Sequence, residues 1–149
     1  GDWIPADIIV TATGLDLQML GGAELRVDGT HVNLSNTMMY KGLMLEKVPN
    51  MALVFGYTNA SWTLKADIAS EFVCRLLKHM RKTGAEKVTP IDEEGCGSDV
   101  NFPNLRSGYI QRPDARLPRQ GNKDPWQNLN DYLHDLPALR YGKMNDGHL

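Results

Sequence analysis

The residues that could do chemistry gather at two places where a predicted strand ends in glycine. Thr13 and Gly14 close the run 7–14, where a glycine lets the backbone approach a ligand closely. After Gly56 the chain passes to a helix predicted to begin at Trp62. A helix start offers unpaired N–H groups and a partial positive charge to an anionic or electron-rich partner. Because open α/β sheets bind ligands beyond the carboxyl ends of their strands, both places are candidate sites. The alternative, two ordinary strand ends with glycine turns, stays open.

The histidines, cysteines and arginines give weaker evidence of a chemical role. The four histidines have no metal-ligand spacing to one another or to the two cysteines. Cys74 is expected to pack as a small apolar group, and Cys96 lies in a glycine loop with no adjacent histidine to activate it. A modest anion-binding surface, or simple exposure to solvent, is expected of Arg106, Arg112, Arg116 and Arg119. We therefore assign no metal-binding residue within this chain.

Length and composition limit the class of protein. The chain has 149 residues, enough for one ordinary domain, and its 42% hydrophobic and 23% charged residues are typical of a globular protein. The net charge of −2 gives no basic field for nucleic acid, and no apolar run is long enough for a membrane span. Two cysteines suit a reducing compartment, so we expect a cytoplasmic protein.

The beginning of the chain is unusual. It starts without methionine and reaches strand-like sequence almost at once, and it lacks the basic and apolar regions of a signal peptide. A processed or tagged terminus is one interpretation. The other is that the chain is a piece of something longer.

The first half contains clear strand and hairpin signals. The β-branched run 7–14 predicts a strand buried on both faces. A two-residue Asp-Gly turn between 23–27 and 30–34 predicts a hairpin. Its expected pairs are Val27 with Thr30, Leu25 with Val32 and Ala23 with Leu34. One face of this hairpin should therefore carry Leu25, Val27, Val32 and Leu34.

A second buried strand and a long helix are predicted next. A glycine- and methionine-bearing connection over 38–45 leads to an apolar run, 51–56, that favours a strand. The helix is expected over 62–83, with Asn59 or Ser61 as its N-cap and a glycine stop. Its apolar stripe, which should pack on a sheet, comprises Trp62, Ala66, Ala69, Val73, Leu76, Leu77 and Met80, widened by Leu64, Ile68 and Phe72. The opposite, solvated side is expected to carry Asp67, Glu71, Arg75, Lys78 and Lys82.

The region 85–149 has a different character and is expected to form an extended C-terminal arm. It holds six of the eight prolines, and its one predicted helix, 124–135, starts with an aspartate N-cap followed by proline. Such a tail is expected to wrap another surface. We therefore predict an α/β fold of sheet strands, a β-hairpin and one long helix over 1–84, followed by the arm over 85–149.

Several segments, in order, resemble one enzyme family. The run 7–14 is similar to the D-x-x-x-x-A-T-G stretch of class B flavoprotein monooxygenases, which include flavin-containing and Baeyer–Villiger monooxygenases. Segments 48–51 and 55–67 resemble their flavin-side strand and helix. Similarity to the subgroup of the mycobacterial ethionamide-activating monooxygenase continues in the tail, through 108–110, 117–121, 125–126 and 130–132. The resemblance covers nearly the whole chain but only about the C-terminal third of such an enzyme.

The resemblance implies a Rossmann-like FAD-binding domain, of which residues 1–84 would be the C-terminal part. Thr13 and Gly14 would lie where the chain crosses back from the nicotinamide-cofactor domain. Asn59, Ser61, Trp62 and Thr63 would lie beside the flavin ring, Trp62 and Thr63 also near the substrate pocket. The family reduces FAD with NADPH, forms a C4a-peroxyflavin with O2 and oxygenates a ketone or a soft heteroatom.

The family's nucleotide-binding glycine loops, fingerprint motif and catalytic arginine would all lie before this chain. We therefore expect the fragment alone to be inactive and its partner to be the missing N-terminal part of the same enzyme. Its substrates would be O2 and a small organic molecule, not nucleic acid, and homo-oligomerisation stays open. The alternatives are a non-catalytic interaction module and an oligomerising sheet fragment derived from such an enzyme.

Overall fold

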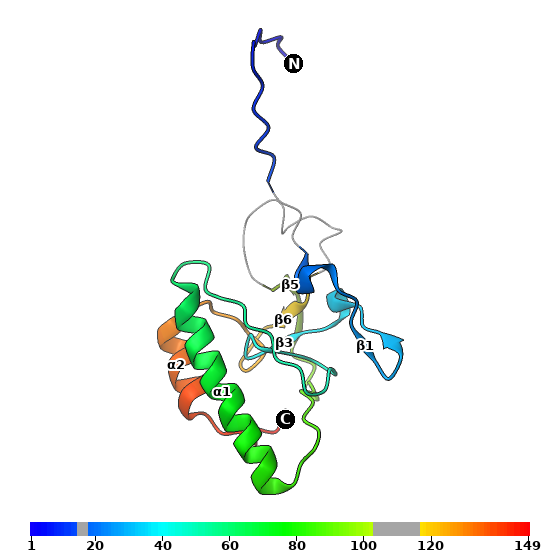
Figure 1. Ribbon diagram of the computed structural model, residues 1–149, viewed down its shortest axis with the longest axis vertical. Helices are drawn as coiled ribbons and strands as arrows, with labels where there is room; N and C mark the ends of the chain where they lie inside the picture. Colours follow the sequence, from blue (N-terminus) through cyan, green and yellow to red (C-terminus); the bar gives the residue numbers. More distant parts are fainter. Residues whose placement is uncertain (15–17, 103–116) are drawn as a thin grey trace.

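The computed structural model describes residues 1–14, 18–102 and 117–149 and shows a mixed α/β arrangement. Its described part contains two α-helices, three two-stranded antiparallel sheets and two short 3-10 helices, η1 (Met19–Gly22) and η2 (Leu34–Asn36). The two α-helices lie side by side on one flank of the strands, and an extended N-terminal arm reaches away from both (Figure 1). A Rossmann-like sheet is not formed by these residues alone.

The long helix α1 (Trp62–Thr83) has the predicted bounds and ends at Gly84. Gly84 takes the left-handed conformation, with φ 74°, that terminates helices. The buried side of α1 is narrower than predicted, because Trp62 and Leu77 are 56% and 58% exposed. The buried positions of α1 recur with the three- and four-residue spacing of one helix face and are Lys65, Ile68, Ala69, Phe72 and Leu76.

The second helix, α2 (Tyr132–Tyr141), packs against α1, and both of its predicted bounds are wrong, since it continues through Pro137 to Tyr141 instead of ending at 135. It does not begin at Asp124, where the chain forms a turn, but after Asp131, whose side chain accepts a hydrogen bond from the N–H of Leu133. Two residues of the predicted solvated side of α1, Glu71 and Arg75, instead contact α2, while Asp67, Lys78 and Lys82 are exposed as predicted. Arg75 donates to the carbonyl of Leu139 at 2.6 Å, and Glu71 accepts from Arg140 at 2.8 Å.

The predicted hairpin forms with the predicted register over a shorter length. Strands β1 (Arg26–Val27) and β2 (Thr30–His31) pair Val27 with Thr30, and Val32 donates to the carbonyl of Leu25 at 2.9 Å. The pairing of Ala23 with Leu34 is wrong because Leu34 already begins η2. The predicted apolar face is confirmed, since its four side chains pack on the smaller of two apolar cores.

The connection 38–45 forms the centre of the fold as a second hairpin. Strands β3 (Met39–Tyr40) and β4 (Met44–Leu45) are joined by a turn with positive φ at Lys41 and Gly42. Because strand side chains alternate, Tyr40 and Met44 enter the core that lies against α1, while Met39 and Leu45 enter the other core. This hairpin therefore joins the two cores.

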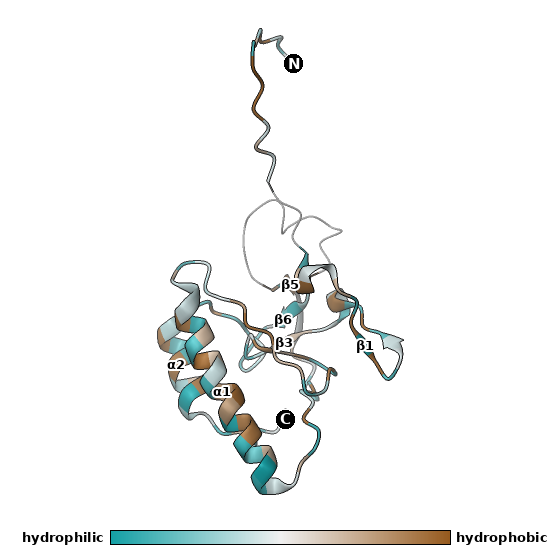
Figure 2. Cartoon of the chain, in the orientation of Figure 1, coloured by the Kyte–Doolittle hydropathy of each residue, from teal (hydrophilic) through white to brown (hydrophobic). Residues whose placement is uncertain are grey.

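Two predicted buried strands do not form. The run 51–56 pairs only through an isolated bridge between Ala52 and Met44. The run 7–14 lies in the extended arm, where Ile9 and Val10 are 81% and 84% exposed. Figure 2 shows apolar residues along this arm, well away from the helices. A strand needs a partner to satisfy its backbone, and no described segment of this chain supplies one for 7–14.

The tail packs on the first half of the chain. Strand β5 (Gly97–Asn101) pairs with β6 (Arg119–Gly121), and Arg119 in β6 donates its N–H to the carbonyl of Thr37 at 2.8 Å. Trp126 is fully buried, with its ring edge-on to that of Tyr40 at 5.4 Å. The surface that the tail wraps is therefore the β3–β4 hairpin and α1. No helix in the described ranges is long and apolar enough to cross a bilayer.

Candidate functional site

The start of α1 is an open donor site. Ser61 is the N-cap residue, but its hydroxyl lies 2.7 Å from the hydroxyl of Thr63 and does not cap the backbone. The first turn holds no acidic side chain, and among the described contacts the N–H groups of Trp62 and Thr63 have no acceptor. Asn59, Ser61, Trp62 and Thr63 are all exposed. The start of α1 can therefore donate hydrogen bonds to an electron-rich partner.

Gly56 and Phe55 hold the indole of Trp62 in place. A Cβ atom built on Gly56 would lie 2.3 Å from two ring atoms of Trp62 and 2.8 Å from its Cα atom. The ring of Phe55 packs on the indole with centroids 5.2 Å apart. Only glycine at position 56 lets the backbone lie this close to Trp62. The glycine that the sequence places between the strand-like run and the helix therefore marks a close contact within the chain.

Thr13 and Gly14 are not brought to the start of α1. Both lie in the exposed arm, and no contact within the described part of the chain joins them to Asn59, Ser61 or Trp62. Gly14 has φ 94°, a conformation open to glycine. The two candidate places of the sequence are therefore separate in this structure, and only the second has a defined geometry.

Behind the start of α1 lies a buried ionic network that sequence reasoning missed. The ammonium of Lys65 lies 2.6 Å from Oδ2 of Asp135, and the hydroxyl of Tyr57 donates to the same oxygen at 2.8 Å. Burial, followed by the hydrogen bond to Asp135, raises the pKa of Tyr57 well above its ordinary value, so this hydroxyl stays protonated. Lys65 could have been found, because it falls on the buried three-four spacing of α1, where a lysine requires a carboxylate partner.

Around this network, Asp135 also contacts a histidine. Nδ1 of His134 lies 3.4 Å from Asp135, and its Nε2 lies 3.0 Å from Asp124. Burial lowers the pKa of His134, but the hydrogen bond to Asp135 and the charge of Asp124 raise it more, so the pKa lies above 6.5. These groups line one side of a cavity of about 230 Å³ between α2 and the C-terminal residues.

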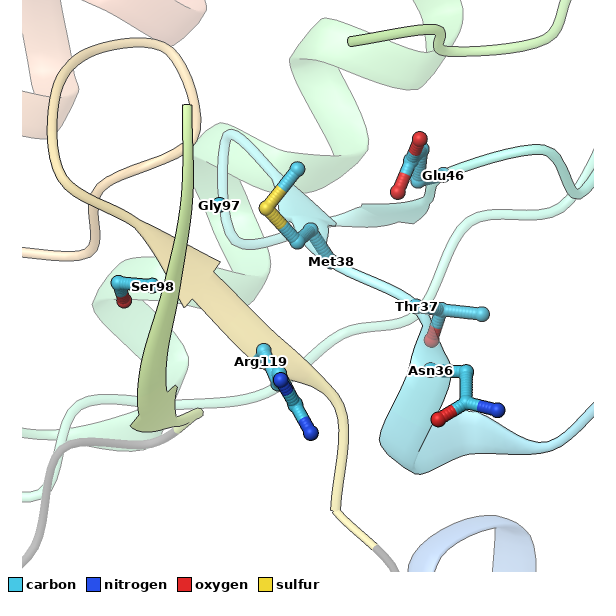
Figure 3. A pocket seen from close by; sticks show the side chains of 7 residues that line it. All are labelled: Asn36, Thr37, Met38, Glu46, Gly97, Ser98 and Arg119. Carbon is cyan, nitrogen blue, oxygen red and sulfur yellow. The ribbon is translucent and has the colours of Figure 1, made fainter. Parts of the chain in front are cut away.

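A larger cavity of about 430 Å³ lies between β3 and the β5–β6 pair (Figure 3). It is lined by Asn36, Thr37, Met38, Glu46, Gly97, Ser98 and Arg119. None of these is a predicted site residue. Of the four arginines named as a possible anion surface, Arg119 lies here, and Arg106, Arg112 and Arg116 lie outside the described residues.

The remaining candidates have structural surroundings. No group of three or more potential metal ligands occurs in residues 1–14, 18–102 and 117–149. Burial raises the pKa of the Cys96 thiol, which therefore stays protonated and unreactive. Cys74 is exposed on α1, contrary to the expectation that it packs as an apolar group.

Comparison with known proteins gives a consistent set of relatives. The FAD-containing monooxygenase EthA of Mycobacterium tuberculosis is 50% identical over 149 residues, and EthA of Mycolicibacterium smegmatis is 47% identical over 146 residues. MymA of Mycobacterium tuberculosis is 51% identical over 148 residues. These alignments cover 98–99% of this chain but 30% of each relative. No family model matches the chain, and no solved structure matches it significantly.

The identities confirm the resemblance carried by the ordered segments, and they extend along the chain from the arm to the tail. The chain spans about 30% of the length of these curated relatives. It is therefore a homologue, along almost its whole length, of one part of the FAD-containing monooxygenases.

Proposed function

We propose that this chain is part of a Baeyer–Villiger-type flavin monooxygenase, the part that follows the nucleotide-binding glycine loops. The complete protein would use NADPH and O2 to oxygenate a ketone or a soft heteroatom of a small organic molecule. The observation that carries the proposal is the 45–51% identity to flavoprotein monooxygenases over 98–99% of the chain. Relatives at this identity share their fold, so this chain's segments would occupy the same places in the complete enzyme.

The donor set at the start of α1 fits a flavin ring. The unpaired N–H groups of Trp62 and Thr63, with the hydroxyl of Ser61, match an electron-rich heterocycle edge better than a cation. Trp62 is exposed and would present an apolar surface beside that edge. Asn59 adds an amide one turn earlier. These four residues are the proposed flavin-side contacts, with Trp62 and Thr63 also facing the substrate.

When bound, FAD would supply the redox chemistry, taking electrons from NADPH and delivering them to O2. The residues of this chain would bind and orient the ring. Fixed N–H dipoles at the start of α1 would stabilise negative charge on the ring without reorganising, and the Trp62 indole would exclude water from it. Because the sequence contains no dinucleotide-binding glycine loop, this chain would not hold the phosphates of FAD or NADPH.

The arm would complete a sheet in the complete protein. Ile8, Ile9 and Val10 form an apolar, β-branched run that is exposed here and has a sequence typical of a strand buried on both faces. We propose that this run adds to the flavin-domain sheet of the missing part, which would place Thr13 and Gly14 at a strand end near the cofactor. An isolated chain would then expose an apolar strand, which also accounts for the alternative of an oligomerising fragment.

The test uses the complete protein that contains this chain. We expect it to purify with about one FAD per chain and to oxidise NADPH faster in the presence of a ketone or a thioether, with formation of the oxygenated product. A complete protein that purifies without flavin and consumes no NADPH with either substrate class would exclude the proposal.

A second test addresses Trp62. In the complete protein, Trp62→Ala is expected to change the relative kcat/KM values for a panel of ketones and thioethers while FAD content stays within about twofold, since the indole would face the substrate and the phosphates would be held elsewhere. Lost flavin with an unchanged substrate preference would contradict this assignment.

A further inference from the structure

We propose that Asn130, supported by Asp135, is a positioning residue that holds the turn before α1 in place for the flavin. Neither residue touches the cofactor in this scheme, and both act through the chain segment 57–65. The inference rests on the proposed function, since it assumes that the start of α1 faces the flavin. According to this inference, residues of the C-terminal tail, far away in sequence, orient the hydrogen-bond donors on the flavin side of α1.

The backbone conformation of Asn130 directs its side-chain amide toward Thr58. Its φ is 54°, in the left-handed region that asparagine tolerates better than most residues, and its N–H donates to the side chain of Asn128 at 3.2 Å. The side-chain amide then contacts Thr58 twice. Its oxygen accepts from the N–H of Thr58 at 3.2 Å, and its nitrogen donates to the Thr58 hydroxyl at 2.7 Å.

These two contacts are the hydrogen bonds that fix the turn 58–60. Within the described part of the chain, Asn59 and Ala60 make no hydrogen bond of their own, and all three residues of the turn are exposed. Thr58 therefore anchors the turn, and Asn130 anchors Thr58. The donor groups of Trp62 and Thr63 follow directly after it.

Asp135 secures the same segment on both sides of the turn. Tyr57, just before the turn, donates its hydroxyl to Oδ2 of Asp135, and Lys65, in the first turn of α1, places its ammonium 2.6 Å from the same oxygen. The tail thus holds the segment at Tyr57, Thr58 and Lys65. A buried ion pair at the third point fixes the start of the helix, while the Asn130 amide fixes the exposed turn.

Loss of the Asn130 amide should therefore loosen the turn and leave the helix in place. Displacement of a catalytic environment by about 1 Å is enough to cost up to about a hundredfold in rate. Since the phosphates of FAD would be held by other parts of the protein, we expect the ring environment to change more than FAD retention. This pattern separates positioning from a general loss of structure.

The experiment compares Asn130→Ala with Asn145→Ala in the complete protein. Asn145 is an exposed asparagine of the same tail with no hydrogen bond to the described residues, so it is the matched control. Without bound flavin, amide hydrogen exchange at Thr58 should quicken at least tenfold in Asn130→Ala and stay unchanged in Asn145→Ala. With flavin, Asn130→Ala should shift the flavin absorption spectrum and midpoint potential and lower kcat roughly tenfold, with FAD content within twofold and the KM for NADPH unchanged.

A second variant keeps the test valid if Asn130→Ala does not fold. Thr58→Val removes only the hydroxyl contact and should change the flavin spectrum in the same direction by a smaller amount. When Asn130→Ala folds, the effects of the two substitutions in the double variant should be less than additive, because both remove the same Asn130–Thr58 interaction.

Unchanged exchange at Thr58, or an unchanged flavin spectrum in a wild-type protein that does bind FAD, would overturn the positioning role. A complete protein that binds no flavin would instead overturn the proposed function. In that case the exchange result alone decides whether Asn130 fixes the turn.

Discussion

The buried pair of Lys65 and Asp135 gives the largest stability effect that we expect from one substitution. Their side chains are 4% and 13% exposed, with the charged atoms 2.6 Å apart. Asp135→Ala would leave the ammonium buried without a counter-charge, which costs about 3–5 kcal/mol. The Tyr57 hydroxyl would lose its acceptor as well, so the loss should lie toward the upper end of this range.

The reverse substitution should cost less. Lys65→Met leaves the Asp135 carboxylate with the Tyr57 hydroxyl as a donor and with some access to water, so we expect a loss of about 1–2 kcal/mol. Combining Lys65→Met with Asp135→Ala removes both charges and should restore about 2 kcal/mol relative to Asp135→Ala alone.

Urea denaturation of the four proteins measures these differences. With a slope of about 2 kcal/mol per molar urea, a loss of 4 kcal/mol lowers the midpoint by about 2 M. Asp28→Asn, at the exposed turn of the first hairpin, is the control and should stay within about 0.5 kcal/mol of wild type. A loss of stability below about 1 kcal/mol for Asp135→Ala, or a loss for Lys65→Met that exceeds the loss for Asp135→Ala, would refute this reasoning.

Three further predictions concern other parts of the molecule. Gly56→Ala should destabilise the fold by about 1–3 kcal/mol and change the tryptophan fluorescence, because its Cβ atom would overlap Trp62; an unchanged spectrum and midpoint would argue against this contact. Because the pKa of His134 is raised in the folded state, its positive charge stabilises the fold, fully so below pH 6.5, and this stabilisation is lost as the pH rises through the folded-state pKa. In urea denaturation at a series of pH values, His134→Gln should flatten the decline of the unfolding free energy with rising pH. A pH profile identical to that of wild type would contradict this prediction. In the isolated chain, deleting residues 1–14 should leave the urea midpoint unchanged and reduce concentration-dependent light scattering, because the arm is exposed there; a lowered midpoint would mean that the arm packs on the fold.

The first hairpin and α1 were predicted correctly because each depends mainly on residues that are close together in the sequence. The Asp-Gly turn at 28–29 predicted the register of the first hairpin, and the N-cap candidate Ser61 together with the terminal glycine predicted the two ends of α1. Each of these depends on residues close together in the sequence. The resemblance to flavoprotein monooxygenases was likewise readable from ordered segments.

Long-range contacts account for what the sequence did not predict. The run 7–14 has the composition of a strand, but a strand forms only beside a partner that this chain does not provide in its described part. The start of α2 was misplaced because Asp124 followed by proline matches the pattern of a helix start, whereas the residue that caps the helix in the structure is Asp131. Asn130 and Asp135 lie 72 and 70 residues from Thr58 and Lys65, a pairing that no local pattern reveals.

A structure of the complete protein with FAD bound tests the central claim most directly. We predict that the flavin ring lies at the start of α1, with a ring oxygen or nitrogen about 3 Å from the N–H of Trp62 or Thr63. A flavin ring bound at another face of the protein, with the start of α1 in contact only with solvent or protein, would contradict the account.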